Sequence, residues 1–164
     1  MKHHRSFITI FVSLIIFSAS PLLPAADDIS RYESCTHCGM DRRQFASSRM
    51  LIEYEKGGSV GVCSLHCMAI EFMVTLDKMP RSIKVADMND NHLLDAEQAY
   101  WIVGGRRPGI MAKRGKWAFA KKEDAEAFLK KNGGSMVSFE EAIKAAYEDI
   151  YENTRMIRNA RTKK

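Results

Sequence analysis

Short stretches of alternating apolar and polar residues predict a strand pair followed by a helix near the middle of the chain. Alternate residues from Met50 to Tyr54 are apolar, as in a strand with one buried face. Residues 56–58 have the composition of a hairpin turn, and Ser59 to Cys63 form the expected return strand. From Ser64, a candidate N-cap, the apolar spacing becomes helical. The residues expected on the inner face of this helix are Leu65, Met68, Ala69, Phe72, Met73 and Leu76.

A similar pattern follows Pro80 and predicts a second unit. The expected elements are a short strand at residues 83–86, strands at 100–103 and 117–120 joined by a loop at 104–109, and a helix at 124–131. Gly133 and Gly134 provide the stop signal for this helix. Shifting the first unit by 57 positions places Val60 on Trp117, so we interpret the two units as a faint internal repeat.

The chain ends in a long predicted helix. Ser138 and Glu141 have the spacing of a capping box, and helical periodicity continues to about Arg158. These elements predict an α+β fold with two small hairpin–helix (ββα-type) units and a long C-terminal helix. We expect a cysteine-rich unit at residues 27–79 and a second unit with the C-terminal helix at residues 80–164.

Residues 1–26 have the pattern of a secretory signal peptide. Lys2 and Arg5 precede an apolar run at residues 7–18, and Ala25 and Ala26 supply the small residues of a cleavage site. The run is about a dozen residues long, whereas a membrane-spanning helix needs about 20. An uncleaved N-terminal anchor is the alternative. We therefore expect a periplasmic protein, exported across the inner membrane, with no stable membrane span after cleavage.

Two further observations refine this placement. The first cysteine is Cys35, so no cysteine lies near the expected cleavage site and we predict that the protein is not a lipoprotein. Loss of residues 1–26 would lower the formal charge from +5 to +3. This mild excess does not indicate nucleic-acid binding. Much of the excess lies in the basic tail at residues 155–164, which is expected to be solvated.

All four cysteines lie between residues 35 and 67 and suggest one metal site. Cys35 and Cys38 form a C-x-x-C pair followed by Gly39, as in a metal-binding knuckle. Cys63 and Cys67 have helical i, i+4 spacing at the start of the first predicted helix, where the helix dipole favours thiolates. A knuckle, a hairpin and a helix start form the order of a treble-clef-like site.

The cysteine pattern leaves several interpretations open. The pairs could form disulfides in an oxidising compartment, act as a redox couple, or bind zinc for structural reasons only. Thiols alone separate Zn²⁺ from Cu(I) poorly, but nearby thioether and imidazole donors suit copper. The weaker candidate ligands are His37, Met40, His66 and Met111. Surface exposure is the simpler explanation for the two histidines.

With Cys35-x-x-Cys-Gly-Met40 in place, the chain resembles the NosL family of nitrous-oxide reductase accessory proteins. The likeness continues in order along the chain through short motifs at residues 85–87, 94–96, 99–100, 108–111, 118–120 and 133–134. The resemblance implies a periplasmic copper-binding protein that supports assembly of a copper enzyme. It also implies a pair of related hairpin–helix units.

Three departures from the family pattern affect the expected site. Met111 matches the family methionine linked to copper, but Lys113 occupies the position of a nearby family histidine. The anchoring cysteine of typical members is absent, and the Cys63/Cys67 pair is not typical of the family. These departures suggest that the metal site has moved to the cysteine cluster.

The expected function is a metal-binding accessory protein rather than an enzyme. No acid–base pair, phosphate-binding loop or nucleophile motif is evident in the sequence. We predict a copper chaperone or delivery factor that carries Cu(I) to a client copper enzyme, such as nitrous-oxide reductase, or to its assembly proteins. The alternative is a structural Zn²⁺ module that binds a protein partner, with the C-terminal helix and basic tail as docking surface.

Overall fold

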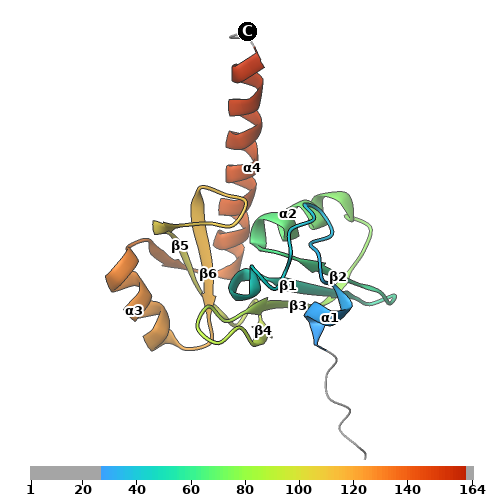
Figure 1. The fold of residues 1–164 in the computed structure, drawn as a ribbon, viewed down its shortest axis with the longest axis horizontal. Helices are drawn as coiled ribbons and strands as arrows, with labels where there is room; N and C mark the ends of the chain where they lie inside the picture. The colour runs from blue at the N-terminus through green and yellow to red at the C-terminus, as the bar shows by residue number, and fades with distance from the viewer. Residues whose placement is uncertain (1–26, 162–164) are drawn as a thin grey trace, which may run out of the picture.

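A computed structural model describes residues 27–161 of the chain (Figure 1). The helices are α1 (Asp28–Arg31), α2 (Leu65–Val74), α3 (Lys122–Asn132) and α4 (Phe139–Arg161), with a 3₁₀ turn at Ala46–Ser48. The strands are β1 (Met50–Tyr54), β2 (Ser59–Val62), β3 (Pro80–Ala86), β4 (Leu93–Asp95), β5 (Tyr100–Pro108), β6 (Arg114–Phe119) and β7 (Ser135–Val137). The predicted α+β fold with a long C-terminal helix is confirmed.

Two antiparallel sheets share the same order over three strands, and the first sheet has β4 in addition. The first sheet runs β2-β1-β3-β4, and the second runs β6-β5-β7. In each unit a hairpin is followed by a helix, and the next strand returns to pair with the first strand of the hairpin. The two units are therefore copies of one ββαβ arrangement.

The strand register supports the internal repeat read from the sequence. Val60 pairs with Ile52 in the first sheet, and Trp117, which lies 57 positions later, pairs with Ile102 in the second. The last strand of each repeat, β3 or β7, follows the helix. Strands β3 and β4 follow residue 79 and nevertheless pair within the first sheet, so the sheets do not divide at that residue. The division into domains stays a prediction.

Two predicted element boundaries are wrong. Residues 104–108 were expected in a loop, but they continue β5 across an irregularity in its pairing with β6. Gly104 and Gly105 have φ values of +87° and +85°, a backbone that favours glycine and produces such a bulge. Helix α2 ends at Val74, so Leu76 lies beyond it in an exposed turn rather than on the inner face.

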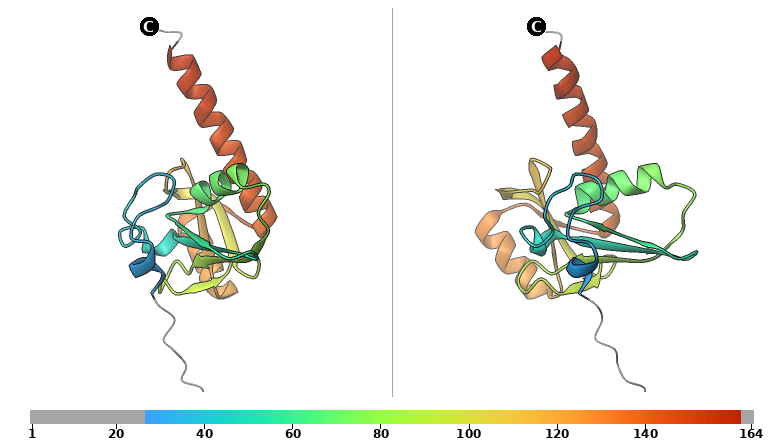
Figure 2. Two further views of the ribbon diagram at one scale, coloured as in Figure 1. Left: turned by 90° about the vertical axis from the view of Figure 1, so that its right-hand side faces the viewer. Right: turned by 45° about the vertical axis from the view of Figure 1, so that its right-hand side comes forward.

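Helix α4 joins the two units and then leaves them. Its first turn carries the predicted capping box, in which the Glu141 N–H donates to Ser138 Oγ at 3.2 Å and the Ser138 N–H donates to Glu141 Oε2 at 2.8 Å. Phe139 stacks on Trp101 in the core, with ring centroids 5.7 Å apart. The second half of α4 stands clear of both sheets in every view (Figure 2). In the described part of the chain, no helix combines the length and apolar character that crossing a membrane requires.

Candidate metal centre

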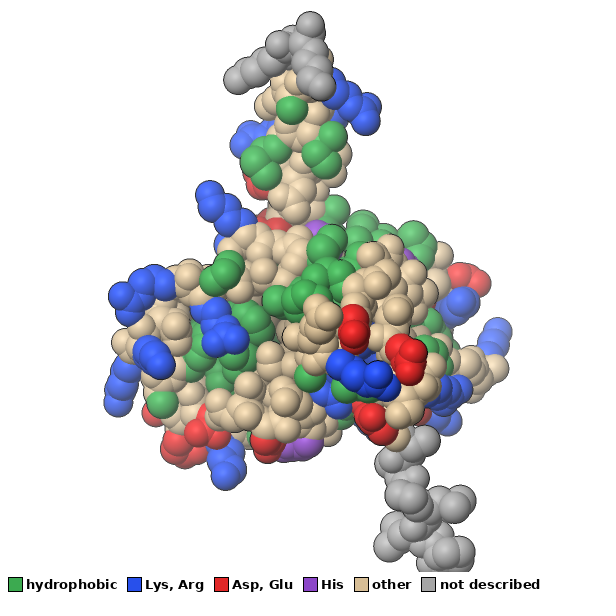
Figure 3. All heavy atoms as spheres, viewed as in Figure 1, with side chains coloured by type: hydrophobic (Ala, Val, Ile, Leu, Met, Phe, Trp, Pro, Cys, Tyr) green, Lys and Arg blue, Asp and Glu red, His purple; other side chains and the backbone are tan. Residues whose placement is uncertain are grey.

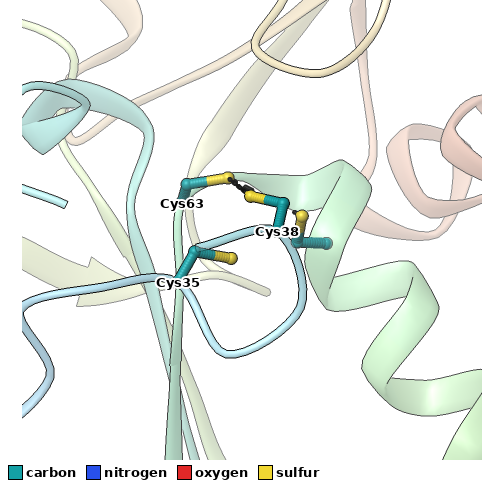
Figure 4. A group of neighbouring side chains, drawn as sticks. Cys35, Cys38 and Cys63 are labelled. Atoms are coloured by element: carbon teal, nitrogen blue, oxygen red, sulfur yellow. Dashed lines mark hydrogen bonds between the residues drawn. The ribbon is translucent and has the colours of Figure 1, made fainter. Parts of the chain in front are cut away.

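The fold brings together the four cysteines that the sequence singles out. Their sulfur atoms all lie within 4.8 Å of one another, and all four residues are free thiols. Cys35 and Cys38 come from the loop before β1, whereas Cys63 and Cys67 come from the junction of β2 with α2. Figure 4 shows the side chains of Cys35, Cys38 and Cys63 turned toward one point beside the start of α2.

Backbone hydrogen bonds shape the loop that carries the first pair. The Cys35 N–H donates to Met40 O at 2.8 Å, and the Gly39 N–H donates back to Cys35 O at 2.9 Å. Gly39 closes the turn at φ +72°, where a Cβ atom would be strained. The loop is thus the tight knuckle predicted from the C-x-x-C-G pattern.

The second pair occupies the end of a strand and the first turn of a helix. Cys63 follows β2 directly, and Cys67 is the third residue of α2. Ser64 holds the N-cap position, but its hydroxyl donates to Ile110 O at 3.2 Å and does not cap the helix. The thiols therefore lie at the positive end of the helix dipole, where negative charge is stabilised.

The spacing of the sulfurs suits a tetrahedral thiolate site. Cys38 Sγ lies 3.6 Å from Cys63 Sγ, and Cys63 Sγ lies 3.7 Å from Cys67 Sγ. A tetrahedron with metal–sulfur bonds of about 2.3 Å has sulfur–sulfur edges of about 3.8 Å. The cluster could hold one soft ion such as Cu(I) or Zn²⁺ after small adjustments.

The thiols perturb each other's ionisation. The neighbouring thiols of Cys63 and Cys67 stabilise a thiolate at Cys35 and hold its pKa well below the ordinary value, although burial acts in the opposite direction. The Cys35 thiolate in turn raises the pKa of Cys63 to about 12 and also raises the pKa of Cys67. Without a metal, these shifts in pKa favour a thiolate at Cys35 beside protonated thiols at Cys63 and Cys67. A bound cation would displace those protons.

Access to the cluster is uneven. Cys35, Cys63 and Cys67 are buried, while Cys38 is only partly buried. The knuckle loop is therefore the side from which a ligand could reach the sulfurs. Met40, on the same loop, is partly buried and packs against the hydrophobic core.

The two candidate histidines lie outside this group of sulfur donors. His37 Nε2 lies 2.8 Å from Glu71 Oε2, and Glu71 Oε1 accepts a hydrogen bond from Tyr54 Oη at 2.6 Å. His66 is buried, and its Nδ1 has no hydrogen-bond partner within residues 27–161. Burial first, and then the charge of Lys116, lower the pKa of His66 and favour its neutral form. Their roles as ligands stay predictions.

Met111 belongs to the loop between β5 and β6. It is 44% exposed and has φ +60°, an unusual conformation for a residue other than glycine. The carbonyl of Ile110, its neighbour, accepts the hydrogen bond from Ser64 beside the cluster. The role of Met111 as a metal ligand also stays a prediction.

Sequence reasoning missed a buried ionic network behind the knuckle. The Asp28 carboxylate accepts hydrogen bonds from Arg42 Nη2 at 2.6 Å and from Arg49 Nη2 at 2.8 Å. All three residues are buried, and Arg42 also donates to Val62 O next to Cys63. No spacing rule connects residues 14 and 21 positions apart in a polar segment, so the sequence held no signal for this network.

Comparisons with known proteins place the chain in a family. A family model described as NosL matches residues 26–147. The copper-binding lipoprotein NosL of Stutzerimonas stutzeri is 36% identical over 61 residues, which cover 37% of this chain and 32% of that protein. The match thus spans about a third of the relative's length. The crystal structure of the copper chaperone NosL from Shewanella denitrificans aligns with a TM-score of 0.56 and 25% identity, covering 71% of this chain and 93% of that one.

One prediction requires correction. The relative from Stutzerimonas stutzeri is named a lipoprotein, which conflicts with our prediction of a protein that is not a lipoprotein, and that prediction is wrong. It rested only on the missing cysteine near residue 26, and this single feature was too little to carry it. The expected signal peptide at residues 1–26 lies outside the described residues. Since the family model matches well over half of the sequence, the chain belongs to the NosL family.

Proposed function

We propose that this chain is a copper chaperone or delivery factor that holds Cu(I) on Cys35, Cys38, Cys63 and Cys67. The observation that carries the proposal is the group of four free sulfurs within 4.8 Å of one another. Thiolates are soft ligands that suit Cu(I). The copper-binding relatives support copper as the cargo.

The uneven burial of the sulfurs suggests how the ion would be released. Cys38 is the most accessible of the four and would be the first sulfur to exchange. His37 and Met40 lie on the same loop and could offer transient ligands during transfer. The hydrogen bond to Glu71 engages only Nε2 of His37, so its Nδ1 is the nitrogen that would take part.

The client we propose is a copper enzyme such as nitrous-oxide reductase, or a protein that assembles it. The support is the family membership together with the resemblance found in the sequence. We assign no catalytic step to this chain. Its task would be to carry the ion, to keep it reduced and bound, and to release it to a partner that offers better ligands.

A structural zinc module is the second candidate. It is favoured by the burial of three of the four cysteines and by the near-tetrahedral spacing, both typical of closed structural zinc sites. In that case the metal would stabilise the first unit rather than move to a partner. Removal of the metal by a chelator would then unfold the knuckle.

Metal content and thiol state, measured together on the full chain, separate these possibilities. We expect one copper per chain after growth in copper, and four titratable thiols after denaturation and metal removal. The double variant Cys35→Ser/Cys38→Ser should lose the copper. The control variant His92→Ala, which removes an exposed imidazole from the loop before β4, should keep it. Copper retained by the double variant would refute the site. One firmly held zinc in the wild-type chain would favour the structural module.

A further inference from the structure

The outer part of α4 lies beyond the residues that the family model matches. The family match ends at residue 147, but α4 continues to Arg161. We call residues 151–161 the arm. At 1.5 Å per residue the arm is about 16 Å long, and it projects into solvent beyond both sheets (Figures 1 and 2). Tyr151, Met156 and Ile157 are exposed on it.

The arm carries unbalanced positive charge. Within the arm, Glu152 is the single acidic residue, whereas three residues are basic: Arg155, Arg158 and Arg161. Arg155 Nη2 lies 2.7 Å from Glu152 Oε2. Both side chains are exposed, so this ion pair offsets the charge of Arg155 only weakly. Neither Arg158 nor Arg161 has an ion-pair partner among the described residues. Figure 3 shows Lys or Arg side chains beside hydrophobic ones on the projecting helix.

The root of the arm is fixed to the body by ion pairs. Arg114 Nε donates to Asp149 Oδ1 at 2.6 Å, and Arg114 Nη2 donates to Glu148 Oε2 at 3.1 Å. Lys116, which is buried, also binds Asp149. These contacts engage the last acidic residues before the arm, so the helix leaves the body in a defined direction.

The same contacts lead back to the metal centre. Arg114 ends the loop at residues 109–113, and the Ile110 carbonyl in that loop accepts the hydrogen bond from Ser64. Ser64 directly follows Cys63, and its Oγ lies 3.8 Å from Cys63 Sγ. The base of the arm and the metal centre are therefore linked through this loop by a short series of contacts.

We propose that the arm docks on an acidic surface of the protein that receives the metal, an inference that rests on the proposed delivery function. The three arginines of the arm select a partner of opposite charge, and the exposed Tyr151, Met156 and Ile157 add apolar contacts along the helix. A membrane surface fits less well. Helical steps of 100° place Tyr151, Met156 and Ile157 around the helix rather than on one face, whereas a helix lying in a bilayer surface needs a single apolar face.

The test measures how fast the copper-loaded full chain associates with the apo form of the proposed client, nitrous-oxide reductase. It compares the wild-type chain with charge variants. The variant R155E/R158E/R161E reverses the arm. The matched control K121E/K130E/K131E makes the same charge change on exposed residues of α3 and its N-cap. A third variant, R158Q/R161Q, removes two charges without weakening helix propensity. Circular dichroism checks that each variant keeps its helix content.

We expect reversal of the arm to slow association about tenfold at low ionic strength and much less at about 0.3 M salt, with the glutamine variant between it and wild type. The α3 control should associate at nearly the wild-type rate. Equal slowing by both reversals, or no salt-sensitive association of the wild-type chain, would overturn the proposal. Arginine-dependent binding to phosphatidylserine vesicles without enzyme binding would assign the arm to a membrane and overturn it too. Copper content is measured in parallel, so that loss of the metal site is distinguished from loss of docking.

Discussion

Replacement of Asp28 by asparagine is expected to destabilise the protein far more than its position at the edge of the fold suggests. Asp28 is the shared acceptor for two buried arginines, with three hydrogen bonds from Arg49 and one from Arg42 to its carboxylate. Asparagine keeps the shape and one oxygen acceptor but removes the negative charge. Both guanidinium groups would then remain buried without a counter-ion.

The magnitude follows from what each arginine retains. Breaking a buried ion pair on one side costs about 3–5 kcal/mol. Arg42 keeps backbone carbonyl acceptors at Val62, Tyr32 and Met50, and Arg49 keeps those of Ala46 and Asn91. These retained contacts favour the low end of this energy range, so we expect a loss of about 3 kcal/mol in the free energy of unfolding. For a chain of this size that corresponds to a fall in Tm of about 9 °C.

The assay is urea and thermal unfolding of the metal-free full chain under reducing conditions. Glu33→Gln is the control, because it breaks the exposed ion pair with Arg43 and should change the unfolding free energy by less than about 0.5 kcal/mol. A loss below about 1 kcal/mol for Asp28→Asn would refute the reasoning, because surface pairs reach that value.

The pH dependence of the same pair provides a second check. Burial alone would raise the pKa of Asp28, but the hydrogen bonds and charges of Arg49 and Arg42 outweigh burial and hold the pKa below 3.8. The resulting stabilisation is present above the unfolded pKa and is lost as the pH falls through the lower folded value. The difference in stability between wild type and Asp28→Asn should therefore be constant near neutral pH and shrink in acid.

Three further predictions concern the metal centre and its surroundings. Copper affinity should fall as the pH decreases, because the pKa of Cys63 is raised to about 12 and its proton must leave before copper binds. The expected decrease is about tenfold per pH unit for each proton displaced. Competition with a Cu(I) chelator at several pH values measures it. Gly39→Ala should cost about 1 kcal/mol of stability in urea unfolding, because no atom lies within 4 Å of an added Cβ and only the positive φ opposes it. Glu71→Gln should lower the pKa of Tyr54 from about 12, because burial and then the Glu71 carboxylate raise it; ultraviolet titration of the phenol detects the change, and an unshifted titration would contradict the contact.

Local rules were sufficient to predict much of the fold. Hydrophobic periodicity located β1, β2 and α2, and the spacing of Ser138 and Glu141 located the start of α4. The cysteine spacing also predicted which four side chains would meet, because knuckle, hairpin and helix start are adjacent along the chain. Each of these features depends on neighbours within a few tens of residues.

Long-range pairing could not be predicted in the same way. The return of β3 and β7 to the first strand of each hairpin depends on packing across a helix, and β7 is only three residues long. The contacts of Asp28 with Arg42 and Arg49 depend on the tertiary structure that encloses them. His37 was expected at the surface, yet its imidazole binds Glu71, 34 positions later.

X-ray absorption at the copper K-edge of the full chain, loaded with one equivalent of Cu(I) under reducing conditions, tests the central claim most directly. The four-cysteine site predicts a first coordination shell of sulfur only, and this shell should be lost in Cys35→Ser/Cys38→Ser. A first shell dominated by nitrogen or oxygen, or a sulfur shell that survives in the double variant, would contradict it.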